Sequence, residues 1–222
     1  MTTAKVVLFD FDGTIADTYN AIVKITNQLS SKFGYKALKE EELLLLKNLS
    51  SREIVKRSEI SVFKIPFLVR RVRTELSKEI ADLSPIQGMS SVLCELKDRG
   101  YILGIVTSNN QENVEVFLRK NKLDFLFSYI YSSTSIFGKH RVIDRAIRNN
   151  KLNKSDVIYV GDETRDIRSS RKSRIGIAAV SWGFNSAEIL QEHNPDCLVN
   201  TPSELLEAID IYHDRRLITT AN

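Results

Sequence analysis

A short apolar run near the beginning of the chain, Val6 to Phe9, stops abruptly at acidic residues. Consecutive apolar residues without alternation are typical of a strand that is buried on both faces of a sheet. Asp10 and Asp12 follow directly, and Gly13 then offers a backbone that can turn. This pattern predicts a strand that presents two carboxylates at the carboxyl edge of a sheet, where open α/β sheets bind ligands.

The following stretch has helical spacing. Apolar residues recur on one helical face from Ile22 to Leu29, and Gly34 then ends the first helix. Further helices are predicted to begin near residues 40, 50 and 66, and the last of them to reach about residue 81. Four successive helices without a strand between them predict a separate α-helical unit.

From residue 89 onward, helices and strands alternate, which predicts a parallel sheet with right-handed crossovers. The fold class is therefore α/β: a Rossmann-like core of residues 1–17 and 86–222, interrupted by an inserted α-helical cap of residues 18–85. The predicted strands are 101–106, 129–131, 157–160, 175–180 and 197–199, and the predicted helices are 89–99, 111–121, 140–150, one around Arg168, and 202–212.

Four of the predicted strands lead into polar clusters. Because the carboxyl ends of parallel strands share one edge, we expect these clusters to converge. Their carboxylates and a backbone carbonyl are the hard oxygen ligands that Mg²⁺ prefers, and amide groups at a helix start can hold phosphate oxygens. The clusters are Asp10 with Asp12, Thr107 with Ser108 and Asn109, Gly138 with Lys139, and Asp162 with Asp166.

Each cluster taken singly also has a structural interpretation. The Asp-x-Asp-Gly segment is a possible polar turn, Asp162 or Asp166 a possible helix cap, and Lys139 a possible surface cation. A calcium loop of the EF-hand type starting at Asp10 is excluded, because its sixth and twelfth positions would be Ile15 and Ala21 instead of Gly and Glu. The order of all four clusters on successive strand ends favours one site for a cation and a phosphate.

The set of motifs resembles that of the haloacid dehalogenase superfamily of phosphohydrolases, over residues 3–212. The carrying segments are Asp10-Phe-Asp12-Gly-Thr14, Thr107, Lys139, and Gly161-Asp162 with Asp166. The helical insert resembles the cap of the phosphoglycolate phosphatase-like and β-phosphoglucomutase-like branch. One departure is His140, where the family often has Pro, which should alter only the start of a helix.

The resemblance implies a role for each residue. Asp10 would attack phosphorus and form an aspartyl-phosphate, and Asp12 would act as general acid and then general base. Mg²⁺ would bind Asp10, Asp162 and the backbone carbonyl of Asp12. The remaining roles are substrate binding by Thr107, Ser108, Asn109 and Lys139, and a supporting position for Asp166, which would orient Lys139 or a metal-bound water.

Three functions stay open at this point. The first is a Mg²⁺-dependent phosphatase of a small phosphorylated metabolite, which the acid at position 12 favours because an alkoxide leaving group needs a proton. The second is a phosphoryl transferase of the mutase type, and the third is a non-catalytic interaction protein with the same fold. The substrate itself is not predicted; Arg52, at the start of a cap helix, is our suggested substrate contact.

Bulk properties add modest limits. The net charge of +4 is too small to argue for nucleic acid, although residues 19–86 hold 13 Lys or Arg against 8 Asp or Glu, as would suit an anionic substrate. Cys94 and Cys197 are far apart in apolar settings, which favours reduced core thiols. With no signal peptide or membrane span in the pattern, we expect a cytoplasmic protein; no oligomeric state is predicted.

Overall fold

The computed structural model describes residues 5–58, 60–133 and 138–220, and its centre is a six-stranded parallel sheet. The strand order is β3-β2-β1-β4-β5-β6, so the first strand lies in the middle. The α/β class with a parallel sheet is thereby confirmed. The strands are β1 (Val6–Phe9), β2 (Ile102–Thr107), β3 (Phe127–Ser132), β4 (Val157–Gly161), β5 (Gly176–Val180) and β6 (Cys197–Val199).

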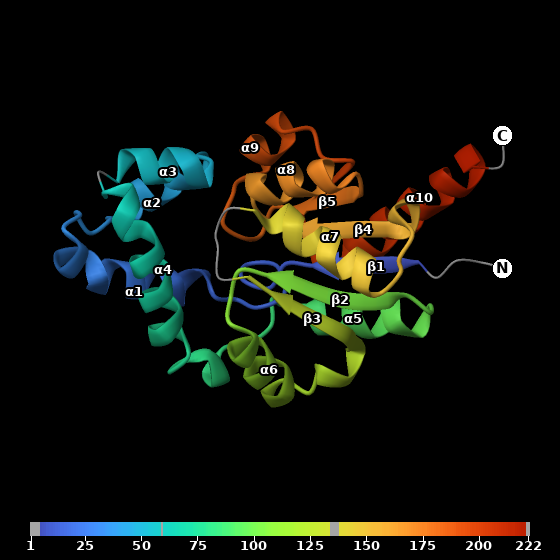
Figure 1. Ribbon diagram of the computed structural model, residues 1–222, viewed down its shortest axis with the longest axis horizontal. Coiled ribbons are helices and arrows are strands. Elements are labelled where there is room, and N and C mark those ends of the chain that lie inside the picture. Colours follow the sequence, from blue (N-terminus) through green and yellow to red (C-terminus); the bar gives the residue numbers. More distant parts are fainter. Residues whose placement is uncertain (1–4, 59, 134–137, 221–222) are drawn as a thin grey trace.

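Helices cover both faces of the sheet (Figure 1). Val7 and Phe9 of β1 share one apolar cluster with three helices on one face of the sheet, among others. Val6 and Leu8 share a second cluster with three helices on the other face. Alternate residues of a strand point to opposite faces, so a continuous apolar run suits a strand covered on both sides. The first group is α5 (Met89–Asp98), α6 (Gln111–Lys120) and α10 (Pro202–Thr220); the second is α7 (Lys139–Asn149), α8 (Thr164–Ser173) and α9 (Ala187–Glu192).

Four further helices lie together beyond the carboxyl ends of the strands (Figure 1). Apolar residues of two of them, among them Ile25 and Leu76, join the same buried cluster as Phe9 and Phe11 of the core. The group is therefore seated on the edge of the sheet where ligands bind in α/β folds. These cap helices are α1 (Tyr19–Phe33), α2 (Glu40–Lys47), α3 (Ser51–Arg57) and α4 (Ile65–Leu76).

The two segments that join the cap helices to the sheet run side by side. The Asp17 N–H donates to the Ser84 carbonyl at 3.0 Å, and the Ile86 N–H donates to the Ile15 carbonyl at 2.9 Å. Paired crossings of this kind agree with boundaries near residues 17 and 86. The division into a core and a cap domain stays a prediction, and its outermost residues, 1–4 and 221–222, lie outside the described residues.

Two helix ends differ from the prediction by several residues, and one α-helix was not predicted. The helix expected from Pro66 to about residue 81 ends at Leu76, followed by a separate 3-10 turn at residues 80–82. Helix α9 was not predicted, because six residues are too short to show a helical period; the Ser186 side chain caps it by accepting from the Ile189 N–H. Helix α10 continues to Thr220 instead of ending near residue 212.

Among the described residues, the structure contains no helix with the length and apolarity needed to cross a membrane.

Candidate active site

Three buried carboxylates meet at the carboxyl edge of the two central strands. Asp10 follows β1, Asp162 follows β4, and Asp166 lies in the first turn of α8. One carboxylate oxygen from each lies within 4.8 Å of the others. The strands hold this arrangement, because the Asp10 N–H extends the ladder by donating to the Val160 carbonyl at 2.8 Å. Asp10 and Asp162, whose carboxylates are predicted to bind a metal ion, are therefore neighbours.

Lys139 lies between two of these acids. Its Nζ is 2.5 Å from Asp10 Oδ2 and 2.5 Å from Asp166 Oδ1, and the side chain is buried. Burial alone would lower the pKa of Lys139, but Asp10 and Asp166 outweigh that effect and raise it. The lysine is thus charged, and it compensates part of the repulsion between the carboxylates. Asp166 contacts Lys139, and its supporting role stays a prediction.

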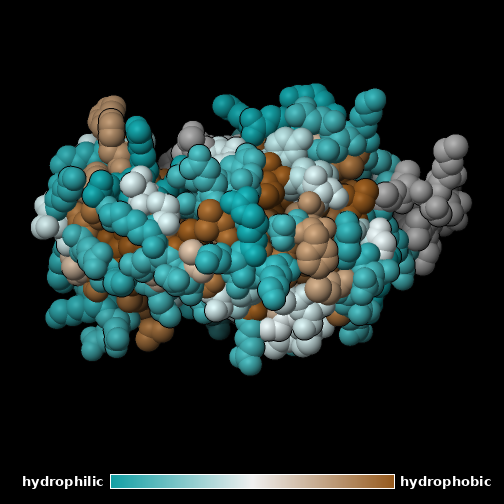
Figure 2. All heavy atoms as spheres, turned by 90° about the horizontal axis from the view of Figure 1, so that it is seen from below, coloured by the Kyte–Doolittle hydropathy of each residue, from teal (hydrophilic) through white to brown (hydrophobic). Residues whose placement is uncertain are grey.

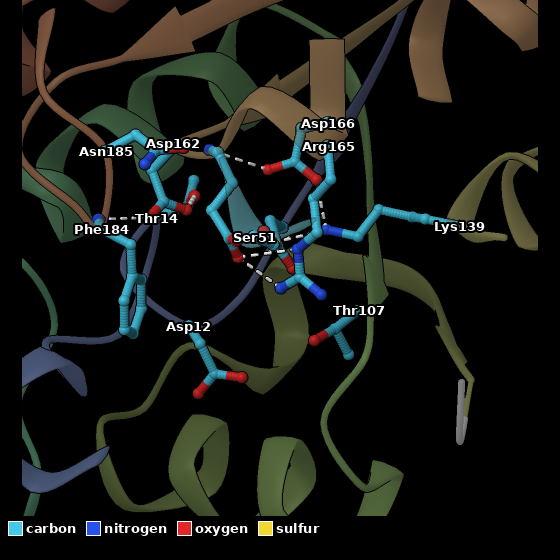
Figure 3. A network of polar contacts seen from close by, with 12 residues as sticks. Asp12, Thr14, Ser51, Thr107, Lys139, Asp162, Arg165, Asp166, Phe184 and Asn185 are labelled. Carbon is cyan, nitrogen blue, oxygen red and sulfur yellow. Dashed lines mark hydrogen bonds and ion pairs between the residues drawn. The ribbon is translucent and has the colours of Figure 1, made fainter. Parts of the chain in front are cut away.

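Asp162 is held by the segments on both sides of it (Figure 3). The Thr14 hydroxyl donates to Oδ1 at 2.8 Å, and the Phe184 N–H donates to Oδ2 at 2.7 Å. Gly13 has φ +74°, and a Cβ there would lie 2.5 Å from Asp162 Oδ2. Burial, followed by Glu163 and Asp10, raises the pKa of Asp162 well above its ordinary value. Such a group gains from a bound cation that favours its charged form.

The Asp12 carboxylate lies apart from this cluster (Figure 3). Both of its oxygens accept from the Asn109 side-chain amide at 3.0 Å. The amide is held in this orientation because Asn109 Oδ1 accepts from the Asn110 N–H and from the Asn113 side chain. Burial, and secondly Asp10, raise the pKa of Asp12 to about 6. Asp12 can therefore exchange a proton near neutral pH, unlike an ordinary aspartate.

The remaining predicted residues follow β2. Thr107 is buried, and its Oγ1 accepts from the Asn109 N–H at 3.0 Å. Ser108 lines the cavity above Asp12. The structure therefore brings Asn109 of the second cluster against Asp12, while Lys139 and the acids of the fourth cluster gather around Asp10.

Two charged residues between the predicted acids were missed. Arg165 donates from Nε to Glu163 Oε1 at 2.8 Å, and Glu163 Oε2 accepts from the hydroxyl of Ser51 in α3 at 2.9 Å. Burial would lower the pKa of Arg165, but Glu163 and Asp10 raise it. Both residues stand inside the motif that contains Asp162 and Asp166, so their position was visible in the sequence while their contacts were not.

A second missed group connects the sheet to the cap. Asn185, in the loop after β5, donates from its side chain to the carbonyls of Lys47 and Leu49, each at 3.0 Å. Its Oδ1 accepts from the Thr164 N–H at 2.9 Å, and its own N–H donates to the Asp162 carbonyl at 3.2 Å. The loop that holds Asp162 therefore also holds the segment between α2 and α3. In the sequence, this loop could have been recognised because it directly follows another predicted strand that ends at the same edge of the sheet.

A cavity of about 840 Å³ lies between the cap helices and this edge of the sheet. Asp12, Asn109 and Arg165 line it from the core side, and Arg73 lines it from α4. Arg73 is buried and was not predicted, whereas Arg52, our suggested substrate contact, is exposed and is not among the lining residues. Asp12 therefore faces a cavity that the cap helices and the core form together.

Comparisons with known proteins agree with this geometry. The family model described as "Haloacid dehalogenase-like hydrolase" matches residues 7–180. The chain is 36% identical over 205 residues to the phosphoglycolate phosphatase of Synechococcus elongatus, covering 92% of this chain and 97% of that protein. It is 26% identical over 205 residues to the pyrophosphatase PpaX of Bacillus cereus, covering 90% and 94%. The crystal structure of a predicted phosphatase from Clostridium acetobutylicum has a TM-score of 0.81 at 25% identity, covering 94% of this chain and 99% of that one.

Proposed function

This chain belongs to the haloacid dehalogenase-like hydrolase family, and from that premise we propose that it is a Mg²⁺-dependent phosphatase of a small phosphate monoester. The reaction would proceed through an aspartyl-phosphate on Asp10. The observation that carries this proposal is the buried cluster in which Asp10, Asp162 and Asp166 lie within 4.8 Å of one another beside Lys139. A nucleophilic carboxylate needs such a setting, because it must approach a phosphate that is itself negative.

Asp10 would supply the nucleophile. One of its oxygens forms a bond to phosphorus while the bond from phosphorus to the leaving alcohol oxygen breaks. Asp12 donates a proton to that leaving oxygen, which departs as an alcohol. Asp12 then takes a proton from water, whose oxygen attacks phosphorus and breaks the bond to Asp10, releasing inorganic phosphate. A pKa of about 6 suits Asp12 to both steps, and such proton transfer typically contributes about 10²–10⁴-fold.

Holding the phosphoryl group would fall to the residues at the ends of β2 and at the start of α7. Lys139 is already 2.5 Å from Asp10, so its charge lies beside the reacting oxygen. Thr107 and the backbone of Ser108 and Asn109 would hold the other oxygens. In phosphoryl transfer, positioning and charge compensation supply most of the catalysis.

The residues present fit Mg²⁺. The donor set is oxygen only, it is buried, and the raised pKa of Asp162 indicates carboxylates that lack sufficient positive charge. Asp10, Asp162 and the Asp12 backbone carbonyl would hold the ion. When bound, Mg²⁺ supplies positive charge that offsets the repulsion between the carboxylate and the phosphate.

The cap, residues 18–85, would act as a domain that closes over the site and excludes water from it. The contacts of Ser51 with Glu163 and of Asn185 with the α2–α3 segment support this role. The relative that is 36% identical is a phosphoglycolate phosphatase, so phosphoglycolate is a suitable first compound to test.

The direct test is to trap the intermediate. Protein turning over a phosphate ester with Mg²⁺ is quenched with borohydride, which reduces an acyl phosphate on Asp10 to the alcohol; peptide mass spectrometry then locates the change. We expect reduction at Asp10 only, dependent on substrate and abolished by EDTA. Reduction elsewhere, or turnover without it, would contradict the proposed intermediate. A phosphatase and a mutase are separated by their products from a sugar phosphate. Release of free phosphate without an isomerised sugar indicates a phosphatase.

A further inference from the structure

The cap helices turn apolar faces toward the cavity as well as toward one another. On α4 the lining residues recur at helical spacing, from Ile65 and Leu68 to Val72 and Leu76. Apolar residues of the other three cap helices, among them Ile22, line the same space. Figure 2 shows apolar surface framed by hydrophilic side chains on the side of the molecule that carries the cap. An apolar helix face normally packs against another element. Leu68 and Leu76 do so in the buried core cluster, whereas Val69 is partly exposed beside the cavity.

The size of the cavity exceeds what the proposed reaction needs. Pockets of about 300–1,000 Å³ bury most of the surface of drug-sized ligands, and this one has about 840 Å³. A helical lid that only excluded water would be more stable with its interior filled, because empty apolar volume costs free energy. The space is also continuous with the site, since Asp12 and Asn109 line it together with the cap residues.

One charged residue, Arg73, interrupts the apolar face of α4 in its last turn, near Asp12. Arg73 is buried, and its carbonyl accepts from the Asn113 side chain at 3.3 Å, which joins this turn of α4 to α6 of the core. Burial lowers the pKa of Arg73, and the charge of Asp12 opposes that shift, so the two groups are close enough to interact. The cavity therefore has a polar end at Asp12 and an apolar face along α4, and Lys36, Glu42 and Arg57 add charged groups to its lining from the cap.

We propose that this cavity is a subsite for an apolar leaving group, so that the preferred substrates are phosphate monoesters of hydrophobic alcohols. The phosphate lies at the acid cluster, Arg73 contacts oxygens near the ester bond, and the hydrocarbon part lies against Leu68, Val69 and Val72. This inference rests on the proposed phosphatase function. Phosphoglycolate and pyrophosphate have no such part, and they would use the polar end alone.

The test measures binding without turnover. Methyl-, butyl- and hexylphosphonate, whose carbon–phosphorus bond is not hydrolysed, are titrated into the protein with Mg²⁺ by calorimetry. Burial of each methylene contributes roughly three- to fourfold in affinity, so we expect hexylphosphonate to bind at least about a hundredfold more tightly than methylphosphonate. Equal affinities along the series would overturn the proposal.

A matched pair of variants locates the subsite. Val69→Phe narrows the cavity one turn from Arg73, whereas Val62→Phe makes the same change at a side chain that is 68% exposed. We expect Val69→Phe to remove about tenfold or more of the preference for hexylphosphonate over methylphosphonate, and circular dichroism and thermal unfolding check that the variant is folded. Val62→Phe should keep the full preference. Equal weakening of all three ligands by Val69→Phe would overturn the assignment.

The two proposals fail in different ways. Turnover of phosphate esters with no dependence of binding on chain length overturns the apolar subsite and leaves the phosphatase intact. Chain-length-dependent binding with no Mg²⁺-dependent release of phosphate from any ester overturns the phosphatase function and leaves a binding subsite.

Discussion

The acid cluster and the cap cavity adjoin each other, yet they are constructed in opposite ways. Around Asp10, every carboxylate of the cluster accepts hydrogen bonds from a defined donor, and Lys139 fits between two of them. In the cavity, partly exposed aliphatic residues such as Val69 and Val72 face open space. One region is closely determined by polar contacts, and the other is left adaptable.

The difference follows from what each region has to recognise. Charge that develops during phosphoryl transfer is stabilised by groups already held in place, so the cluster needs fixed partners. A hydrocarbon group is recognised by contact area, which has no preferred direction. We infer that the core determines the reaction and that the cap determines which alcohol carries the phosphate.

The largest expected effect lies in the core. Asp10→Asn removes the nucleophile while keeping the size of the side chain, so Mg²⁺-dependent phosphate release should fall by at least about 10⁴-fold. The fold should persist, as measured by circular dichroism and thermal unfolding. Asp17→Asn is the matched control, an exposed aspartate seven residues later, and should retain full activity. Comparable rates in the two variants would sink the assignment of Asp10.

A second substitution tests whether the cluster depends on its lysine. Lys139→Met leaves Asp10 and Asp166 buried without the cation between them, and breaking a buried ion pair from one side costs about 3–5 kcal/mol. We expect the free energy of unfolding in urea at pH 8 to fall by about 3 kcal/mol. Lys154→Met removes an exposed pair with Asp144 and should cost less than about 1 kcal/mol. Equal losses would mean that the cluster is not electrostatically coupled.

The pH dependence of stability is the next largest effect. Asp12 has a pKa of about 6 when folded and about 3.9 in an unfolded chain, so the folded protein binds more protons across this interval. Stability without metal should therefore be higher at pH 5 than at pH 8, and this contribution is lost as the pH rises through about 6. We expect Asp12 to account for on the order of 1–3 kcal/mol in urea unfolding with EDTA.

Asp12→Asn provides the comparison for this effect, because an amide does not titrate. The variant should show a shallower decline in unfolding free energy between pH 5 and pH 8 than the unaltered chain. Mg²⁺ should also flatten the decline, since a bound cation favours charged carboxylates. The same slope in both proteins would show that Asp12 titrates normally.

Much of the core arrangement was predictable because its signals are local. The run Val6–Phe9 marks a fully buried strand, and the acids after it fall at the carboxyl edge by the rule for parallel sheets. The same rule brought Lys139 and Asp162 to Asp10 in the prediction, and the structure places them there. Spacing along the chain was sufficient because regular strands fix where their ends lie.

The rest depends on tertiary contacts that no local pattern encodes. Phe184 and Asn185 follow β5, and their bonds to Asp162 and to the cap arise only when the loop folds across the sheet edge. In the sequence, the apolar residues of α4 have the spacing of an ordinary helix face that packs in a core. Whether it packs against a neighbour or lines a cavity depends on how four helices cross, although Arg73 within that stripe was a visible exception.

The smallest expected effect tests the connection between the two regions. Ser51 of α3 donates to Glu163, which in turn accepts from Arg165, so Ser51→Ala removes a hydrogen bond between cap and core without touching the acids. A bond of this kind contributes about 1 kcal/mol, and we expect KM to rise about three- to tenfold with little change in kcat. Ser77→Ala is the control, because the Ser77 hydroxyl donates to the Thr74 carbonyl, a contact within the cap. If both variants leave KM unchanged, the cap closes without the hydrogen bond from Ser51. The hydrogen bonds of Asn185 would then be the contacts that join the cap to the core.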